Sequence, residues 1–195
     1  MKTNIILAGV GGQGILTIAA ILDTAALADG LNIKQSEVHG MSQRGGAVQS
    51  HVRIADKPIY SDLIPQGKAH LIIAVEPMES LRYLPYLKKK GLLVTDSNPF
   101  INIPNYPEQE DLFEEIRSHK NNLLVDAKKI AKEIGNSKAT NIVLLGAASH
   151  RLPMSSETII EAIKQLFARK GERIVDKNIE AFNKGRALLA DAAIL

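Results

Sequence analysis

The sequence predicts an α/β protein: a three-layer, doubly wound, mostly parallel Rossmann-like sheet with a helical C-terminus and room for one antiparallel hairpin. Short apolar segments such as 4–8 show no polar alternation, which is typical of parallel strands buried on both faces. These segments alternate along the chain with stretches of helical periodicity. A glycine-rich turn, 9–14, joins the first strand to the first helix. The 195 residues suit one domain, residues 1–195.

The strands are predicted from short apolar runs bounded by turn residues. The segment 47–54 alternates instead, with Gln49, His51 and Arg53 on one face, so we expect it to be half exposed. The stretch 59–61 is a candidate hairpin partner for it. The expected strands are 4–8, 31–38, 47–54, 70–75, 92–96 and 121–125.

The helices are predicted from apolar residues at a spacing of three and four, and from residues that favour helix ends. Pro77 suits a first helical position, Ser155 suits a cap, and Gly30 and Gly135 suit positions just after a helix. The run Lys88-Lys89-Lys90 is expected to close a helix, where cations complement the dipole. The expected helices are 15–29, 77–90, 108–118, 127–134, 137–151, 155–170 and 175–194.

The composition excludes several classes of function. The chain has no cysteine, which excludes disulfides, thiolate zinc sites and Fe–S clusters held by this chain. A net charge of +3 and 4% aromatic residues give little support for nucleic-acid binding. No run of about 18 apolar residues and no signal peptide is evident, so we expect a cytoplasmic protein without membrane spans.

The turn after the first strand matches G-x-G-x-x-G at Gly9, Gly11 and Gly14. Such a turn lets backbone N–H groups approach a phosphate at a helix N-terminus. Glu37 lies about where a dinucleotide fold places its ribose-binding acid. The alternative is that the glycines only pack the helix on the strand. The candidate cofactor-binding residues are Gly9, Gly11, Gly12, Gln13, Gly14, Ser42, Gly45 and Gly46.

A polar loop follows the second strand, from Glu37 to Gly46. Ligands of α/β sheets bind at such loops. Arg44 is the first candidate for a functional residue, because its guanidinium can hold a carboxylate or phosphate in a bidentate manner; a structural salt bridge is the alternative. His39 suits a hydrogen bond to a substrate carbonyl or a proton shuttle, and equally a loop imidazole satisfied by backbone carbonyls. The predicted catalytic residues are His39, Gln43 and Arg44.

Several other residues remain open between a binding and a structural role. His51 is expected to face solvent or a partner, and no metal site is expected from Glu37, His39 and His51. The other positions are Glu76 (ligand or first-turn helix charge), Asp96 (rim residue or, preferably, an Asx-type turn) and Thr140-Asn141 (pointing to the sheet edge or capping).

Two long motifs carry a resemblance to a known family: Ile5 to Ile15, and Ser36-Glu37-Val38-His39-Gly40-Met41-Ser42-Gln43-Arg44-Gly45-Gly46. Together they resemble the gamma-type domain of the 2-oxoacid:ferredoxin oxidoreductases, most of all the branch that acts on indolepyruvate. Further agreement comes from Val75-Glu76-Pro77, Thr140-Asn141 and Asn178. The resemblance covers nearly the whole chain.

The resemblance implies a small subunit that completes the active site of a large subunit and is inactive alone. The complex would convert a 2-oxoacid such as indolepyruvate or another aryl pyruvate to aryl-acetyl-CoA, CO2 and reduced ferredoxin. Thiamine diphosphate and the Fe–S clusters would lie on the large alpha subunit, with coenzyme A as co-substrate. The glycine turn and the polar loop would border that site, and Gln43 and Arg44 would meet the partner, the substrate or a coenzyme A phosphate.

Two alternatives remain. One is a free-standing Rossmann-type enzyme that binds NAD(P) or another nucleotide. The other is a non-catalytic docking module that uses the polar loop only as a contact surface. The isolated chain is expected to be able to form a homodimer in place of its heteromeric interface.

Overall fold

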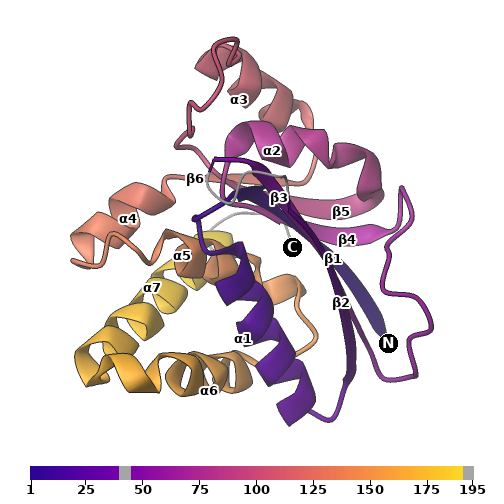
Figure 1. The fold of residues 1–195 in the computed structure, drawn as a ribbon, viewed down its shortest axis with the longest axis vertical. Helices are drawn as coiled ribbons and strands as arrows, with labels where there is room; N and C mark the ends of the chain where they lie inside the picture. Colours follow the sequence, from indigo (N-terminus) through magenta and orange to yellow (C-terminus); the bar gives the residue numbers. More distant parts are fainter. Residues whose placement is uncertain (40–44, 191–195) are drawn as a thin grey trace.

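The computed structural model describes residues 1–39 and 45–190. A six-stranded mixed sheet lies at the centre, in the order β2-β3-β1-β4-β5-β6 (Figure 1). The predicted α/β class with a mostly parallel sheet is confirmed. The strands are β1 (Lys2–Val10), β2 (Asn32–His39), β3 (Ala47–Ala55), β4 (Ala69–Ala74), β5 (Leu87–Asp96) and β6 (Asn122–Val125).

The antiparallel part of the sheet is the hairpin of β2 and β3. β3 runs antiparallel to β2 on one side and to β1 on the other, whereas β1, β4, β5 and β6 are parallel. The hairpin that we expected at 59–61 is therefore wrong in place, because these residues form no strand. Periodicity assigns strands but not their neighbours, so the sequence could not show that β3 separates β2 from β1.

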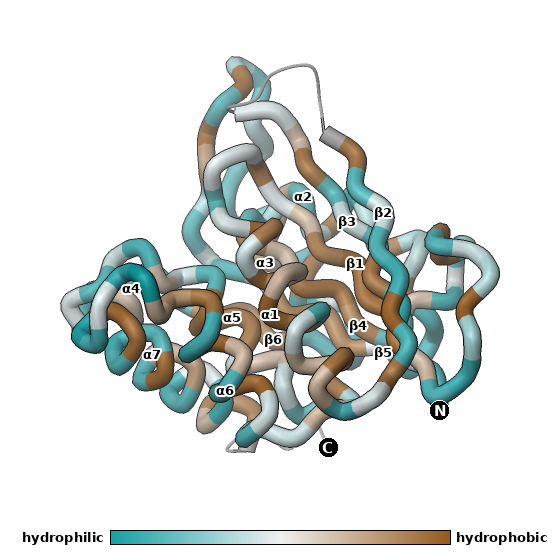
Figure 2. Tube along the Cα trace, turned by 60° about the horizontal axis from the view of Figure 1, so that its bottom comes forward, coloured by the Kyte–Doolittle hydropathy of each residue, from teal (hydrophilic) through white to brown (hydrophobic). Residues whose placement is uncertain are grey.

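Helices cover both faces of the sheet (Figure 1). The larger core cluster is covered by α1 (Ile15–Ala28), α4 (Ala127–Glu133), α5 (Thr140–Ala148), α6 (Ser156–Phe167) and α7 (Glu172–Ala190). On the other face lie α2 (Pro77–Arg82) and α3 (Gln109–Ser118), over a smaller cluster. Short 3-10 turns occupy 84–86, 149–151 and 168–170. Figure 2 shows the hydrophobic residues gathered along the central strands.

The prediction of a helix over 77–90 is wrong beyond Arg82. Lys88-Lys89-Lys90 lies in β5 rather than at a helix end. Pro85 disfavours a helical conformation of the residue before it, and Leu87 already pairs with Ala69 of β4. Pairing with a neighbouring strand therefore overrides the helical periodicity of this segment.

The prediction that His51 faces solvent or a partner is also wrong. His51 and Arg53 are buried, because the segment after β3 folds back over them. The Nδ1 atom of His51 accepts a hydrogen bond of 2.9 Å from the backbone N–H of Ile64. Arg53 Nη1 donates to the carbonyl oxygens of Ser61 and Leu63 at 2.6 and 2.9 Å. A polar strand face is thus paired with the backbone polar groups of a loop.

α5 and α7 cross with their backbones almost in contact. A Cβ atom added to Gly146 would lie 2.1 Å from the carbonyl oxygen of Phe182, and one added to Gly185 would lie 2.0 Å from that of Val143. Only glycine fits at either position. The crossing fixes the relative position of the two helices whose first turns border the site described next.

Candidate functional site

A cleft of about 880 Å³ opens at the carboxyl ends of the parallel strands β1, β4 and β5. Clefts of roughly 300–1,000 Å³ hold small molecules and cofactors. The glycine turn and the start of α1 form one side, and Val75 and Asp96 lie where β4 and β5 end. The remaining sides come from the β5–α3 connection, the start of α4, the α4–α5 connection with the start of α5, and the end of α6 with the start of α7. Their residues are Asn98, Pro99, Phe100, Lys128, Asn136, Ser137, Lys138, Thr140, Asn141, Phe167, Lys170, Ile174 and Asn178.

The glycine turn presents a helix N-terminus to this cleft. Gly14 caps α1 with φ +82°, and Gly12 has φ +100°, both in the left-handed region. The helix has 14 residues and no acidic side chain in its first turn. Its first N–H groups and the positive end of its dipole are therefore available to an anion.

Some residues of the glycine turn line the cleft, and others serve packing or close the turn. Gly12, Gln13 and Gly14 line the cleft, whereas Gly9 serves packing: a Cβ there would lie 2.3 Å from Val75 Cγ2. Gln13 Oε1 accepts a hydrogen bond of 2.8 Å from the backbone N–H of Val10 and so closes the turn. Close packing is therefore confirmed at Gly9, whereas ligand binding by Gly12, Gln13 and Gly14 stays a prediction.

Asn141 of α5 holds the turn in place. Its Nδ2 donates a hydrogen bond of 2.9 Å to the carbonyl oxygen of Gly14. A Cβ at Gly14 would lie 2.5 Å from the same nitrogen, so only glycine fits there. Thr140 Oγ1 donates to the carbonyl of Ser137 at 3.4 Å, and among the described residues no side chain caps the start of α5, so the capping alternative is wrong. Of the two, Asn141 carries the link to the site.

The turn also touches the end of the polar loop. The N–H of Gly11 donates to the carbonyl oxygen of Gly46 at 2.9 Å. Gly45 has φ +81°, and its carbonyl oxygen accepts a hydrogen bond from the Asn102 side chain. The structure therefore brings together the two motifs that the sequence singled out, which lie more than 30 residues apart in the chain.

Three predicted site residues, Ser42, Gln43 and Arg44, lie outside the described residues. His39 ends β2 opposite Val48, but its side chain is also outside the described part. Their roles therefore stay predictions.

Asp96 borders the cleft on the side of β5, and Asn98 links it to a second carboxylate, that of Asp126. Asp96 Oδ1 accepts hydrogen bonds from the N–H of Ala127 at 3.2 Å and from Nδ2 of Asn98 at 3.0 Å. Its bond of 3.3 Å from the N–H of Asn98 confirms the Asx-type turn. Burial raises the pKa of the Asp96 carboxyl. The hydrogen bond from the Asn98 side chain, 2.9 Å, lowers the pKa of Asp126, which caps α4.

Three lysines line the cleft, and no pattern in the sequence points to them. Lys128 begins α4, Lys138 lies between α4 and α5, and Lys170 precedes α7. No motif links these residues, because they come from three separate parts of the chain. Lys170 Nζ also lies 5.1 Å from the centre of the Phe167 ring. With the N-terminus of α1, these cations make the cleft suited to an anionic ligand such as a phosphate ester.

Glu76 has a structural role. It is fully buried, caps α2 through the N–H of Glu79 at 2.8 Å, and also accepts hydrogen bonds from the N–H of Phe100 at 3.3 Å and from the Tyr106 hydroxyl. The alternative of a ligand to the cleft has no support, since Glu76 does not line it. Within the part of the chain that the structure describes, no group of three His, Asp or Glu side chains could hold a metal ion.

The sheet order argues against a dinucleotide-binding enzyme. In that fold the acid that holds the ribose ends the strand next to β1. Here β3 lies between, so Glu37 is two strands, or roughly 10 Å, from β1. Glu37 Oε2 accepts a hydrogen bond of 3.2 Å from Gln35, and the residue does not line the cleft.

Comparison with known proteins gives the family. The profile of the pyruvate ferredoxin/flavodoxin oxidoreductase family matches residues 4–188. The indolepyruvate oxidoreductase subunit IorB of Pyrococcus horikoshii is 42% identical over 192 residues, which cover 93% of each chain.

Two solved structures share the fold. The keto/oxoacid ferredoxin oxidoreductase gamma subunit of Geobacter sulfurreducens has a TM-score of 0.69 and 28% identity, over 96% of this chain and 99% of that one. The 2-oxoglutarate:ferredoxin oxidoreductase of Magnetococcus marinus, solved with 2-oxoglutarate, coenzyme A and succinyl-CoA bound, has a TM-score of 0.80 and 24% identity, over 100% of this chain and 32% of that one. Among the described helices, none is long and apolar enough to cross a membrane. Since the family profile matches nearly the whole chain, the protein belongs to the pyruvate ferredoxin/flavodoxin oxidoreductase family.

Proposed function

We propose that this chain is the small subunit of a cytoplasmic indolepyruvate ferredoxin oxidoreductase. The complex decarboxylates indolepyruvate or a related aryl pyruvate, transfers the acyl group to coenzyme A and passes the electrons to ferredoxin. The observation that carries the proposal is the 42% identity to an indolepyruvate oxidoreductase subunit over 93% of both chains. The cleft at the carboxyl edge of the sheet gives this subunit a place in the reaction.

The chemistry is divided between two subunits in this proposal. Thiamine diphosphate supplies the carbon–carbon bond cleavage, and it lies on a large alpha subunit with the Fe–S clusters. The present chain has no cysteine with which to ligate a cluster. Its own contribution is to bind and orient the co-substrate and to complete the wall of the shared site.

We assign the cleft to the phosphate-bearing part of coenzyme A. The left-handed turn at Gly12–Gly14 exposes backbone donors at the start of α1, and Lys128, Lys138 and Lys170 supply positive charge around it. Gly46 joins the turn to the polar loop through its carbonyl. Arg44, Gln43 and His39 of that loop are proposed to act where the cleft meets the partner.

The proposal is tested with the chain alone and after co-expression with the thiamine-binding subunit. Indolepyruvate and coenzyme A are supplied, and reduction of ferredoxin or a viologen is followed. Activity only in the two-chain complex is expected. A complex that forms with full turnover when Arg44→Ala is introduced would remove Arg44 from the site, and NAD(P) binding by the chain alone would favour the dinucleotide alternative.

The role of the cleft has its own test. Lys138→Ala is expected to raise KM for coenzyme A by about tenfold, because one charge-assisted hydrogen bond to a phosphate is lost. Lys164→Ala is the matched control, since Lys164 is an exposed lysine of α6 that pairs with Glu161 and does not line the cleft. Equal KM values for the two variants would contradict the assignment.

A further inference from the structure

The connection between β5 and α3 carries an unusual concentration of exposed apolar side chains. Phe100, Ile101 and Ile103 are 45%, 73% and 42% exposed, within four consecutive residues. Prolines flank and follow them at positions 99, 104 and 107. An exposed apolar cluster of this kind typically marks an interaction site.

The buried carboxylate of Glu76 fixes the backbone of this segment. Glu76 accepts hydrogen bonds from the N–H of Phe100 and from the hydroxyl of Tyr106, so both ends of the segment are fixed to the cap of α2. Asn102 between them donates to the carbonyl of Gly45. The apolar side chains are thus displayed on a backbone with a fixed shape, which lowers the entropic cost of binding.

The β5–α3 connection itself and the first part of α3 are acidic. Residues 98–116 contain five acidic side chains and no lysine or arginine, although the whole chain has a net charge of +3. Glu108, Glu110 and Asp111 are exposed where α3 begins, directly after the apolar segment. A surface with an apolar centre and an acidic border selects a partner with an apolar centre and a basic border.

The position of the cluster relates it to the site. Pro99 and Phe100 line the cleft, and Asn102 contacts the end of the polar loop, so a protein bound here would also border the cleft. In the solved structure from Magnetococcus marinus, this fold makes up only 32% of a longer chain. A domain of this fold therefore occurs joined to further protein.

We propose that residues 99–105 and the acidic start of α3 form the docking surface for the large subunit that carries thiamine diphosphate. The large subunit meets it with an apolar patch bordered by lysine or arginine side chains. The inference rests on the proposed function and adds to it the surface through which the two chains assemble.

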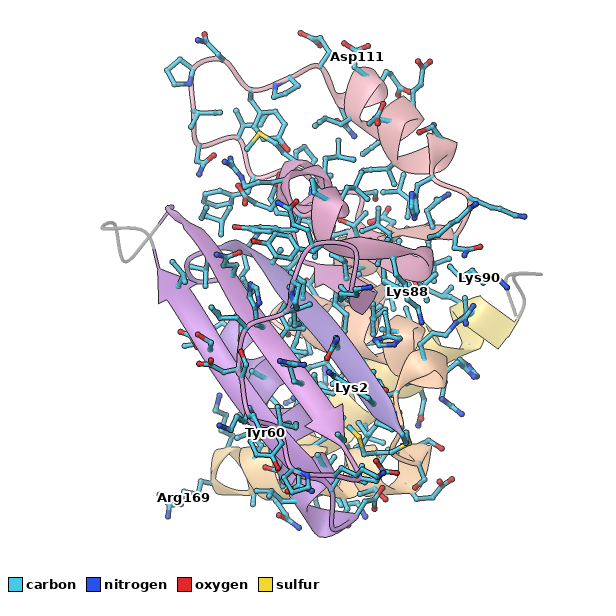
Figure 3. The ribbon with its side chains drawn as sticks, turned by 90° about the vertical axis from the view of Figure 1, so that its right-hand side faces the viewer. Lys2, Tyr60, Lys88, Lys90, Asp111 and Arg169 are labelled. Carbon is cyan, nitrogen blue, oxygen red and sulfur yellow. The ribbon has the colours of Figure 1, made fainter. Side chains whose placement is uncertain are left out.

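The test measures the affinity between the purified chain and the large subunit. Ile101→Asp is expected to weaken association at least about tenfold, because it places a charge at the centre of the apolar patch. Tyr60→Asp is the matched control: Tyr60 is 93% exposed, and Figure 3 shows it at the opposite end of the molecule from Asp111. It is expected to stay within about twofold of the unmodified chain. Thermal unfolding of both variants confirms that they are folded.

A charge reversal tests the acidic border separately. The double variant Glu110→Lys/Asp111→Lys is expected to slow association and to weaken its dependence on salt. Glu161→Lys, an exposed acid on the opposite face of the sheet, is expected to leave both unchanged.

Several outcomes would overturn the proposal. Association of Ile101→Asp with unchanged affinity, or equal loss in Tyr60→Asp, would place the interface elsewhere. A dimer of the unmodified chain that Ile101→Asp dissociates would assign the surface to a second copy. Failure of the unmodified chain to bind any thiamine-carrying subunit would instead refute the proposed function, and this inference with it.

Discussion

Substitution of Gly14 by alanine tests how the glycine turn is held. An alanine in the left-handed region costs about 1–2 kcal/mol relative to glycine. The added Cβ would also lie 2.5 Å from Asn141 Nδ2, whereas ordinary contacts begin at 3.4 Å. Asn141 is only 5% exposed and would have to give up its hydrogen bond to Gly14 as it moves. A buried amide without a partner costs about a further 1–3 kcal/mol.

Gly30, just beyond the other end of α1, is the control for backbone strain alone. It has φ +69°, and an added Cβ would meet nothing within 4 Å. We expect Gly30→Ala to cost about 1–2 kcal/mol and Gly14→Ala about 2–5 kcal/mol. At roughly 2–4 °C per kcal/mol for a domain of this size, the melting temperature should fall by about 4 °C and about 10 °C respectively.

Thermal unfolding followed by circular dichroism measures both values, and a double-mutant cycle identifies the contact. In an Asn141→Ala background, Gly14→Ala should cost no more than Gly30→Ala, because the side chain that it would displace is gone. Equal melting temperatures for the two single variants, or strictly additive effects in the cycle, would refute the reasoning.

Three further predictions concern stability. Burial lowers the pKa of the His51 imidazole, so below about pH 6.5 the unfolded chain binds more protons than the folded chain. The free energy of unfolding should therefore fall as the pH drops from about 7.5 to about 5.5. In the variant His51→Gln this fall should be less steep. Gly185→Ala should cost at least about 3 kcal/mol, because its Cβ would meet the Val143 carbonyl oxygen at 2.0 Å and the helices would have to separate. Glu76→Gln should cost about 1–3 kcal/mol and expose the β5–α3 connection to proteases, because a neutral amide cannot accept all three hydrogen bonds equally well.

The two hydrogen-bonding and packing variants have controls in the same chain. Asn183→Ala, at an exposed position of α7, and Glu108→Gln, an exposed acid next to the same connection, should change stability by less than about 0.5 kcal/mol. A pH dependence that His51→Gln leaves as steep as before, or variants of Gly185 and Glu76 as stable as their controls, would contradict the packing and hydrogen bonds described above.

The local signals in the sequence predicted local structure well. Ser155 accepts the N–H of Thr158 as a helix cap, and Gly135 follows α4 with φ +73°, as their positions indicated. Where a neighbouring strand decides the outcome, prediction failed: Lys88-Lys89-Lys90 lies in β5 instead of ending a helix, and the hairpin forms at β2–β3 instead of at 59–61.

The candidate site divides in the same way. Gly12, Gln13 and Gly14 could be predicted because a strand–turn–helix junction has its own pattern, and they do line the cleft. Lys138 and Lys170 could not, because what unites them is a position in space that only the packed helices create. Asn141 was partly predicted, but its bond to Gly14 joins residues 127 positions apart.

The glycine crossing of α5 and α7 has a consequence for motion at the cleft. Asn141 belongs to the first turn of α5, and Ile174 and Asn178 belong to the first two turns of α7, so one side of the cleft is carried by two helices that cannot slide past each other. The opposite side consists of the glycine turn and the segment 98–100, which are connections. Because α5 and α7 hold Asn141, Ile174 and Asn178 at fixed relative positions, their wall of the cleft is rigid, and conservative changes on the outer surface of the two helices should leave the rate of product release unchanged.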